Sequence, residues 1–348
     1  MPMTEFLELR FPYKPAHRKF VEAHFAQDEL HLTGDYLKVL VARVRLDPCR
    51  ERLKALEDLK DILWYWRIDR KYTKDEIQQA EIFRLDWKAS AVSNQGGEED
   101  GYDESSACSV CGAGRVQKSD LILNVRQLPK RKGFARTLSD EVLVSQEAAE
   151  VLLDHKLTGF RFRSVRHHTS RFDGPVTVSA VPTGRELIEK AALVGTNYPS
   201  PEFSVWMNRK ENSDLANKMM AEGDVRAERL ASRRPLPIWY QMVPSGQPVS
   251  LSPATQFGYT ALDPDIKGEY RCPFGHTEGW SLLSEAYVKR SSWDGSDYCV
   301  TTQLYGQHPP GSLFYARPLF LISRKMRSVL AEAEVPGVRS EVAHLVEE

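Results

Sequence analysis

The sequence predicts an α+β protein. We expect a mostly helical N-terminal region over residues 1–90, followed by two related, duplicated α/β lobes over 91–200 and 201–348. Two observations favour this architecture. Apolar residues recur at three- and four-residue steps early in the chain, which is typical of amphipathic helices. Two later segments share one strand–helix–strand pattern, and each follows a short motif with cysteine that resembles a zinc knuckle.

The N-terminal helices are predicted from start signals and apolar spacing. Asp47-Pro48 is typical of a helix N-cap and its first residue. The apolar residues that follow on one face are Leu53, Leu56, Leu59, Leu63 and Trp66. Thr73 and Glu76 match a capping box, which predicts another helix directly after Thr73. A further short helix is expected around residues 20–25.

Two segments about 178 residues apart align without a gap. The first, from Leu143, reads LVSQEAAEVLLDHKLTGFRFRSVRH, and the second, from Leu321, reads LISRKMRSVLAEAEVPGVRSEVAHL. Each predicts a short strand that ends at a serine cap, a helix of about three turns, a glycine at the helix end and a second strand. The identical pairs are Leu143 with Leu321, Ser145 with Ser323, Val151-Leu152 with Val329-Leu330, Gly159 with Gly337, and Arg161 with Arg339. We therefore expect two related lobes side by side, joined by a linker that is partly helical over 203–232.

Four residues in two knuckles form the candidate metal site: Cys108, Cys111, Cys272 and His276. The spacing of Cys108 and Cys111 lets both thiolates reach one ion from a tight turn, and the second pair lies at the equivalent place in the repeat. The set predicts a closed, structural Cys₃His zinc site. A vestigial knuckle without metal and a redox dithiol remain open alternatives. Cys299 is an alternative to His276 as the fourth ligand.

Three other groups of residues could have a functional role. A basic stretch contains Arg161, Arg163, Arg166, His167, His168 and Arg171, and a second contains Arg226, Arg229, Arg233 and Arg234. Either could contact phosphates, but acids interleave with the second, and we interpret both as solvated surface. Polar residues in and after the turn at 293–297 could line a site, and we interpret most of them as turn and strand-edge chemistry.

Composition and charge exclude several classes of protein. The 47 basic and 48 acidic residues nearly cancel, which argues against a general polyanion binder. No apolar run approaches the roughly 18–20 residues that span a bilayer, and the N-terminal residues do not resemble a signal peptide. Five cysteines are too few for a disulfide scaffold, so we expect a reduced, cytoplasmic protein in which Cys49 is a packing residue. Nucleotide loops, GxSxG and HExxH motifs are absent, which disfavours an enzyme.

The chain resembles a group of myxobacterial paralogues with a double CxxCG motif. The resemblance rests on CSVCG at 108–112, the degenerate CPFGH at 272–276, EIFRLDW at 81–87 and FLISRKMRSVLAEAEVPGVRSEVAHL at 320–345. It covers residues from about 80 to 345. That group is similar to the immunity proteins of bacterial polymorphic-toxin systems. The resemblance therefore implies a non-catalytic protein that neutralises a cognate toxin by binding it.

The leading hypothesis is thus a cytoplasmic immunity factor whose protein partner is a toxin. Binding surfaces of this kind commonly centre on aromatic and arginine anchors. The tryptophans considered as anchors are Trp64, Trp206, Trp239 and Trp293. The alternatives are a zinc-stabilised nucleic-acid-binding protein and an enzyme with a site between the two lobes.

Overall fold

The computed structural model consists mainly of β-sheet, with a few short helices. The predicted α+β class with a helical N-terminal region is therefore wrong. Among the described residues, no helix is long and apolar enough to cross a membrane. The structure describes residues 3–33, 39–46, 56–87, 91–92, 102–124, 127–130, 133–168, 176–177, 238–306 and 315–347.

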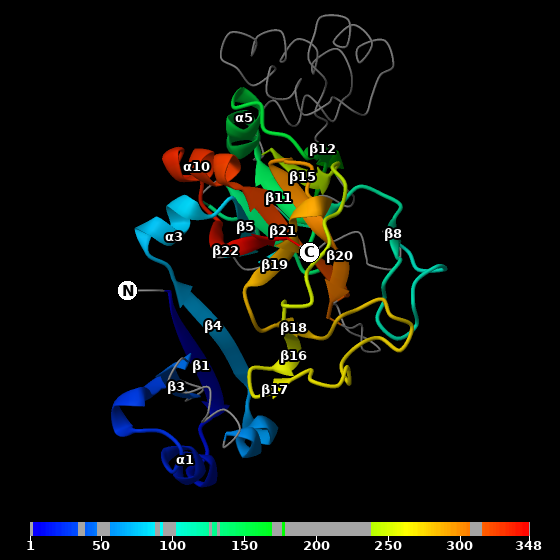
Figure 1. The fold of residues 1–348 in the computed structure, drawn as a ribbon. Helices are drawn as coiled ribbons and strands as arrows, with labels where there is room; N and C mark the ends of the chain where they lie inside the picture. Colours follow the sequence, from blue (N-terminus) through cyan, green and yellow to red (C-terminus); the bar gives the residue numbers. More distant parts are fainter. Residues whose placement is uncertain are drawn as a thin grey trace, which may run out of the picture.

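The N-terminal region forms a four-stranded antiparallel sheet instead of a helical unit (Figure 1). Its strands, in spatial order, are β2 (Leu30–Thr33), β3 (Val39–Arg45), β1 (Thr4–Pro12) and β4 (Tyr65–Lys71), and its helical segments are α1 (Pro15–Glu22), η1 (Gln27–Glu29) and η2 (Glu57–Ile62). Leu7, Leu9 and Phe11 alternate along β1 and are fully buried. Apolar residues at every second position indicate a strand. The helical prediction for the whole region instead followed the three- and four-residue spacing of the apolar residues at 53–66.

The predicted N-terminal helices have mixed outcomes. The capping box is confirmed: Thr73 caps α3 (Lys74–Gln79), with reciprocal hydrogen bonds to Glu76. The short helix expected around residues 20–25 overlaps α1, which begins earlier at a proline. The helix expected behind Asp47-Pro48 is wrong where the structure describes it. Residues 57–62 form only a 3-10 helix and Trp66 lies in β4, while residues 47–55 lie outside the described chain.

Two five-stranded sheets form the rest of the core. One has the order β12 (Phe160–Ser164), β15 (Trp239–Pro244), β11 (Val142–Ser145), β10 (Phe134–Thr137) and β6 (Ala91–Val92). The other has the order β19 (Ala286–Lys289), β22 (Val338–Val346), β5 (Ile82–Trp87), β21 (Arg317–Ser323) and β20 (Tyr298–Tyr305). Helices α5 (Gln146–Asp154) and α10 (Arg324–Glu332) lie next to each other at one end of the described structure (Figure 1).

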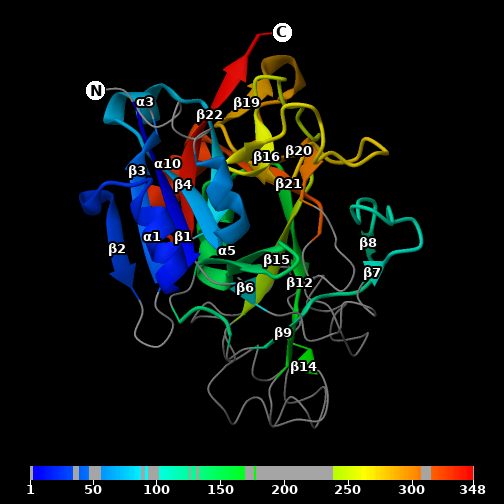
Figure 2. The ribbon, with the colours of Figure 1, turned by 90° about the horizontal axis from the view of Figure 1, so that it is seen from below.

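Three small sheets and one short helix complete the described structure. They are the pair β7 (Tyr102–Asp103) and β8 (Val116–Gln117); the sheet β14 (Val176–Thr177), β13 (Arg166–His168) and β9 (Ile122–Asn124); the sheet β17 (Asp263–Pro264), β16 (Phe257–Thr260) and β18 (Ser281–Leu282); and η4 (Arg290–Ser292). Figure 2 shows β7 and β8 at one side of the molecule, away from α1. This hairpin encloses the first cysteine knuckle.

The two aligned segments form the same local unit, β11–α5–β12 and β21–α10–β22. Ser145 accepts a hydrogen bond from the Ala148 amide, and Ser323 accepts one from Met326, so both predicted caps are confirmed. The two units are not self-contained in their strand pairing. β15 pairs with both β11 and β12, while β5, which precedes both units, pairs with both β21 and β22. Each unit therefore takes its central strand from a distant part of the chain.

The two units approach each other through reciprocal backbone contacts. The Phe134 amide donates to Pro336 O at 2.8 Å, and the Tyr298 amide donates to Thr158 O at 3.1 Å. The residues that follow these two acceptors are Gly337 (φ +100°) and Gly159 (φ +90°). A Cβ at Gly337 would lie 2.0 Å from the Phe134 carbonyl oxygen, and one at Gly159 would lie 2.0 Å from that of Tyr298; these residues begin β10 and β20, which pair with the opposite unit. Only glycine permits both the backbone angle and the close approach.

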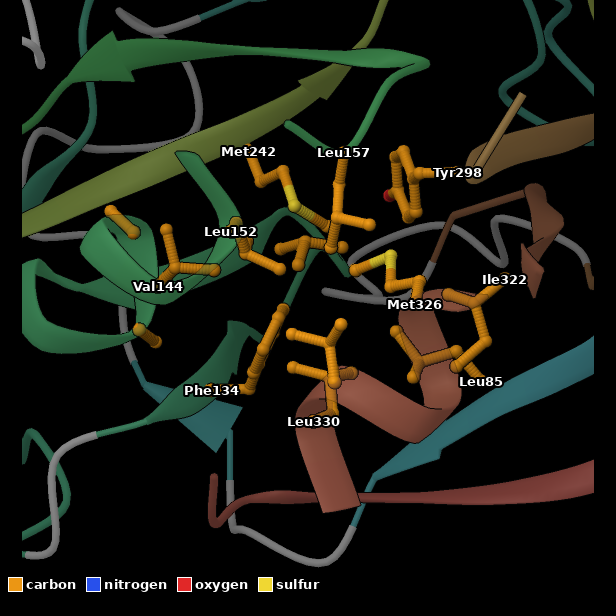
Figure 3. Packing of buried hydrophobic residues seen from close by; sticks show 14 of the residues in the cluster. Leu85, Phe134, Val144, Leu152, Leu157, Met242, Tyr298, Ile322, Met326 and Leu330 are labelled. Atoms are coloured by element: carbon orange, nitrogen blue, oxygen red, sulfur yellow. The ribbon is translucent and has the colours of Figure 1, made fainter. Parts of the chain in front are cut away.

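Both helices bury their apolar faces in one shared core. Figure 3 shows Leu152 and Leu157 of the first unit meeting Met326 and Leu330 of the second. Met242 and other side chains from β15 and β5, the central strands that come from distant parts of the chain, fill the space between them. The two units therefore share one hydrophobic core, and neither has a separate one.

A buried ionic cluster fastens the N-terminal sheet to β22. Arg70, on β4, donates to Glu5 at 2.8 Å, to Glu341 at 3.0 Å and to the Leu283 carbonyl at 2.8 Å. The Arg70, Glu5 and Glu341 side chains are at most 5% exposed. Arg84, on β5, also donates to Glu341. Since buried charges are costly without partners, this geometry fixes how the two sheets meet.

We expect Gly337→Ala to lower the free energy of unfolding by about 3–5 kcal/mol, because the new methyl group would force the two units apart. Gly295→Ala is the matched control. Gly295 also has a positive φ, +84°, but a Cβ added there would have nothing within 4 Å, so its loss should be about 1 kcal/mol. Urea denaturation measures both. Equal losses would show that the inter-unit contact is not tight.

We expect Arg70→Met to lower the free energy of unfolding by about 3–5 kcal/mol, because it removes the buried cation that Glu5 and Glu341 share, while Arg84 still contacts Glu341. Arg290→Met is the control, since the Arg290–Glu81 pair is exposed on both sides. Exposed pairs contribute at most about 1 kcal/mol. The same denaturation experiment compares them, and a loss at Arg70 no larger than that at Arg290 would contradict the role given to the cluster.

Candidate metal centre

The candidate ligands lie on two loops from distant parts of the chain. Cys108 and Cys111 lie between β7 and β8, and Cys272 and His276 lie between β17 and β18. Each loop closes a tight turn through a backbone hydrogen bond, which joins residues four positions apart in the first loop and three positions apart in the second. The Gly112 amide donates to the Cys108 carbonyl, and the Gly275 amide donates to the Cys272 carbonyl, both at 2.8 Å.

The local sequence explains why both loops form knuckles. Gly112 has φ +68° and Gly275 has φ +76°, so each turn contains a left-handed residue at a glycine. The turns are closed from the first ligand: the Cys108 amide donates to the Ala113 carbonyl, and the Cys272 amide donates to the Thr277 carbonyl and hydroxyl. The extra residue in the second knuckle is therefore accommodated without loss of the turn.

The four ligand atoms converge on one point. All of them lie within 4.8 Å of one another. The Cys108 Sγ–Cys272 Sγ distance is 3.7 Å, Cys111 Sγ–His276 Nδ1 is 3.8 Å and Cys272 Sγ–His276 Nδ1 is 3.7 Å. A tetrahedral ion bound at about 2.3 Å to sulfur separates its ligands by about 3.8 Å. Cys108, Cys111, Cys272 and His276 can therefore hold a metal ion.

The thiols differ in their surroundings. Backbone amides of Cys111 and Val110 point at the Cys108 sulfur and lower the pKa of this thiol to about 6. Burial raises the pKa of the Cys111 thiol to about 12. Metal ligation requires thiolates, and a bound cation would favour the deprotonated form of both.

The site is anchored to the second core sheet. Leu304 of β20 and Ala316 pack against the cysteines, and Thr277 bridges to Leu304. Beside the first knuckle, the guanidinium of Arg115 lies 3.3 Å from the centroid of the Tyr315 ring and 4.2 Å from that of Tyr102. The two loops and β20 therefore meet at the ligand cluster.

Cys299 is the one further cysteine among the described residues, and it is not part of this cluster. Cys299 is buried on β20 in a separate apolar cluster, and burial raises the pKa of its thiol to about 12. The alternative in which Cys299 replaces His276 is not supported, because His276 completes the set. Cys49 lies outside the described residues.

The other sequence candidates do not converge on a site in the described part of the chain. Arg163 and Arg166 of the first basic stretch share Asp120, at 3.1 and 4.0 Å. The second stretch, residues 226–234, and Arg171 lie outside the described residues, as do the His167 and His168 side chains.

The polar residues around the turn at 293–297 are bonded to the fold itself. Asp297 accepts hydrogen bonds from Thr158 and Ser323, so its carboxylate links the two units. The Thr301 hydroxyl accepts from the Leu319 amide, and the Gln303 side chain accepts from the Leu251 amide. These contacts give the residues a structural role.

Of the candidate tryptophan anchors, Trp239 is a core residue and Trp64 is 62% exposed. Trp293 is half-buried and Trp206 is outside the described chain. Sequence reasoning did not single out Val110 and Phe274, which lie between the ligands of each knuckle and are exposed. Their position inside the motifs was the available signal, since a tight knuckle turns its intervening side chains outward.

A scan against protein-family models and searches of curated proteins and of solved structures found no match to this chain.

We expect the purified protein to bind one equivalent of Co²⁺ with the intense visible bands of a tetrahedral thiolate site. Cys111→Ser and His276→Ala should weaken or abolish these bands, since each removes one ligand. Cys299→Ala is the control and should keep the full stoichiometry. An octahedral spectrum, or a spectrum that depends on Cys299, would contradict the assigned ligand set.

Proposed function

We propose that Cys108, Cys111, Cys272 and His276 bind a single zinc ion with a structural role. Three sulfur ligands and one imidazole are a donor set that zinc favours, and four protein ligands leave no open position for a substrate. The ligand spacing given above supports this proposal. Zinc would then join two loops whose first cysteines are 164 residues apart in the chain, and its loss would release both.

We further propose that the chain is a non-catalytic cytoplasmic protein that neutralises a cognate toxin by binding it. The resemblance to the double-CxxCG group suggests this role, and one structural observation carries it. The two knuckles that carry the four candidate ligands also expose two apolar side chains, Val110 on the first and Phe274 on the second. Phe274 is 66% exposed. Such side chains on a rigid support are typical of protein-binding surfaces.

The surface beside the second knuckle continues this character. Tyr259 is 47% exposed and stacks on Tyr270, which lies two residues before Cys272, with ring centroids 5.4 Å apart. Ile266, in the same loop region, is 82% exposed. A zinc ion that rigidifies the knuckles would lower the entropy cost of presenting these side chains to a partner.

We expect the protein to rescue the growth of bacteria that express the toxin encoded beside its gene, and to co-purify with that toxin. A Val110→Ser, Phe274→Ser double variant should lose rescue and bind at least about tenfold more weakly, while its melting temperature stays near wild type because both side chains are exposed. Leu32→Ser, which removes an exposed apolar side chain from β2 of the N-terminal sheet, is the matched control and should still rescue.

The same preparations separate the alternatives. Co-purifying nucleic acid with steeply salt-dependent binding would contradict the toxin-binding proposal and favour a nucleic-acid-binding protein. Rescue that persists in the double variant would place the partner surface elsewhere.

A further inference from the structure

A pocket of about 410 Å³ lies between α10, the turn that follows it and the start of β22. Its apolar wall includes Leu85, Ile322, Leu330 and Val338. Pockets that bind small molecules typically measure about 300–1,000 Å³ and combine apolar walls with a few polar groups. This pocket is separate from the knuckles, because the residues that line it come from the core units.

The polar side of the pocket contains the guanidinium of Arg327. Its Nε donates to the Ser340 hydroxyl at 3.0 Å, and the group lies 4.9 Å from the centroid of the buried Phe83 ring. In the part of the chain that the structure describes, Arg327 forms no ion pair. Partial burial lowers the pKa of its guanidinium. A half-buried cation without a carboxylate is energetically costly, and an anion would satisfy it.

The other charged groups at the pocket are already paired or exposed. Arg339 reaches the rim but pairs with Asp86 at 2.5 Å and with Asp69 at 3.4 Å. Glu334 lies on the exposed end of the turn after α10. Among the described residues that line the pocket, Arg327 is therefore the group whose terminal N–H donors remain available to a ligand.

Comparison of the two β–α–β units shows how the hollow arises. The positions of Ser340 and Arg327 correspond to Phe162 and Ala149 in the first unit. There, the Phe162 ring packs 5.8 Å from the ring of Tyr240. The second unit has a small hydroxyl in place of that aromatic ring, and it brings a cation into the space. Its core packing is thus incomplete where the first unit is filled.

We propose that this pocket binds a small monocarboxylate with an apolar body. The carboxylate would accept hydrogen bonds from the terminal nitrogens of Arg327, whose planar fork matches a carboxylate in a bidentate arrangement. The apolar body would lie against Leu330 and Val338, in the space that the first unit fills with Phe162. This inference is independent of the metal site and of the toxin-binding proposal.

The test uses 3-phenylpropionate as the probe and 3-phenylpropan-1-ol as its uncharged counterpart, with the full-length protein. Saturation-transfer NMR titration should give a dissociation constant on the order of 1 mM for the acid. The alcohol should bind at least about tenfold more weakly, because it cannot form the charge-assisted pair.

Three variants make the result specific. Arg327→Met should weaken binding of the acid at least about tenfold. Ser340→Phe should abolish binding while the melting temperature stays equal or rises, since it fills the hollow as Phe162 does. Lys325→Met, which removes an exposed charge from the same helix, is the matched control and should bind like wild type.

The proposal is overturned if the acid shows no saturable binding, if the alcohol binds equally well, or if Ser340→Phe binds like wild type. Ser340→Phe decides the outcome even if Arg327→Met does not fold. None of these results bears on the zinc site, so failure here and failure of the proposed function are distinguishable.

Discussion

The close backbone approach of the two β–α–β units is the constraint on which the rest of the structure depends. Phe134 and Tyr298 each begin a strand by donating to a carbonyl of the opposite unit, immediately before Gly337 and Gly159 respectively. At these points no side chain separates the units. α5 and α10 are therefore brought onto one core, and the exchanged strands β5 and β15 complete both sheets. Because each sheet needs a strand from a distant part of the chain, neither half has a complete core of its own.

The cluster of four candidate metal ligands and the Arg70 cluster extend this arrangement outward in different ways. The knuckles join two long loops at the edge of β20, where few apolar contacts are available to hold them, and a metal ion is an effective substitute for a missing core. The Arg70 cluster joins two sheets through buried charges that require specific partners. Apolar contacts alone tolerate small shifts, whereas a buried guanidinium with three acceptors fixes one orientation.

The two units share their backbone but differ in the side chains beside it. Phe162 fills a space in the first unit that Ser340 leaves open in the second, with Arg327 at its wall. Likewise, Asp297 takes the position before β20 that Gly133 takes before β10, and its carboxylate holds both Thr158 and the cap of α10. The shared backbone supports the fold. The positions at which the two units differ provide the proposed pocket beside Arg327 and the carboxylate of Asp297 that links the units.

The sequence by itself determined the local features. The caps at Thr73, Ser145 and Ser323 and the knuckle turns depend on neighbouring residues, so their signals are contained in a few positions. The same is true of the choice of the four ligands. Only the tertiary structure decided that the N-terminal region is a sheet and that β5 and β15 exchange places. Strand pairing joins segments far apart in the chain. An alternation such as that of Leu7, Leu9 and Phe11 indicates a strand, but it does not specify which other strand will pair with it. The pocket at Arg327 also depends on such pairing, because β22 brings Ser340 beside α10.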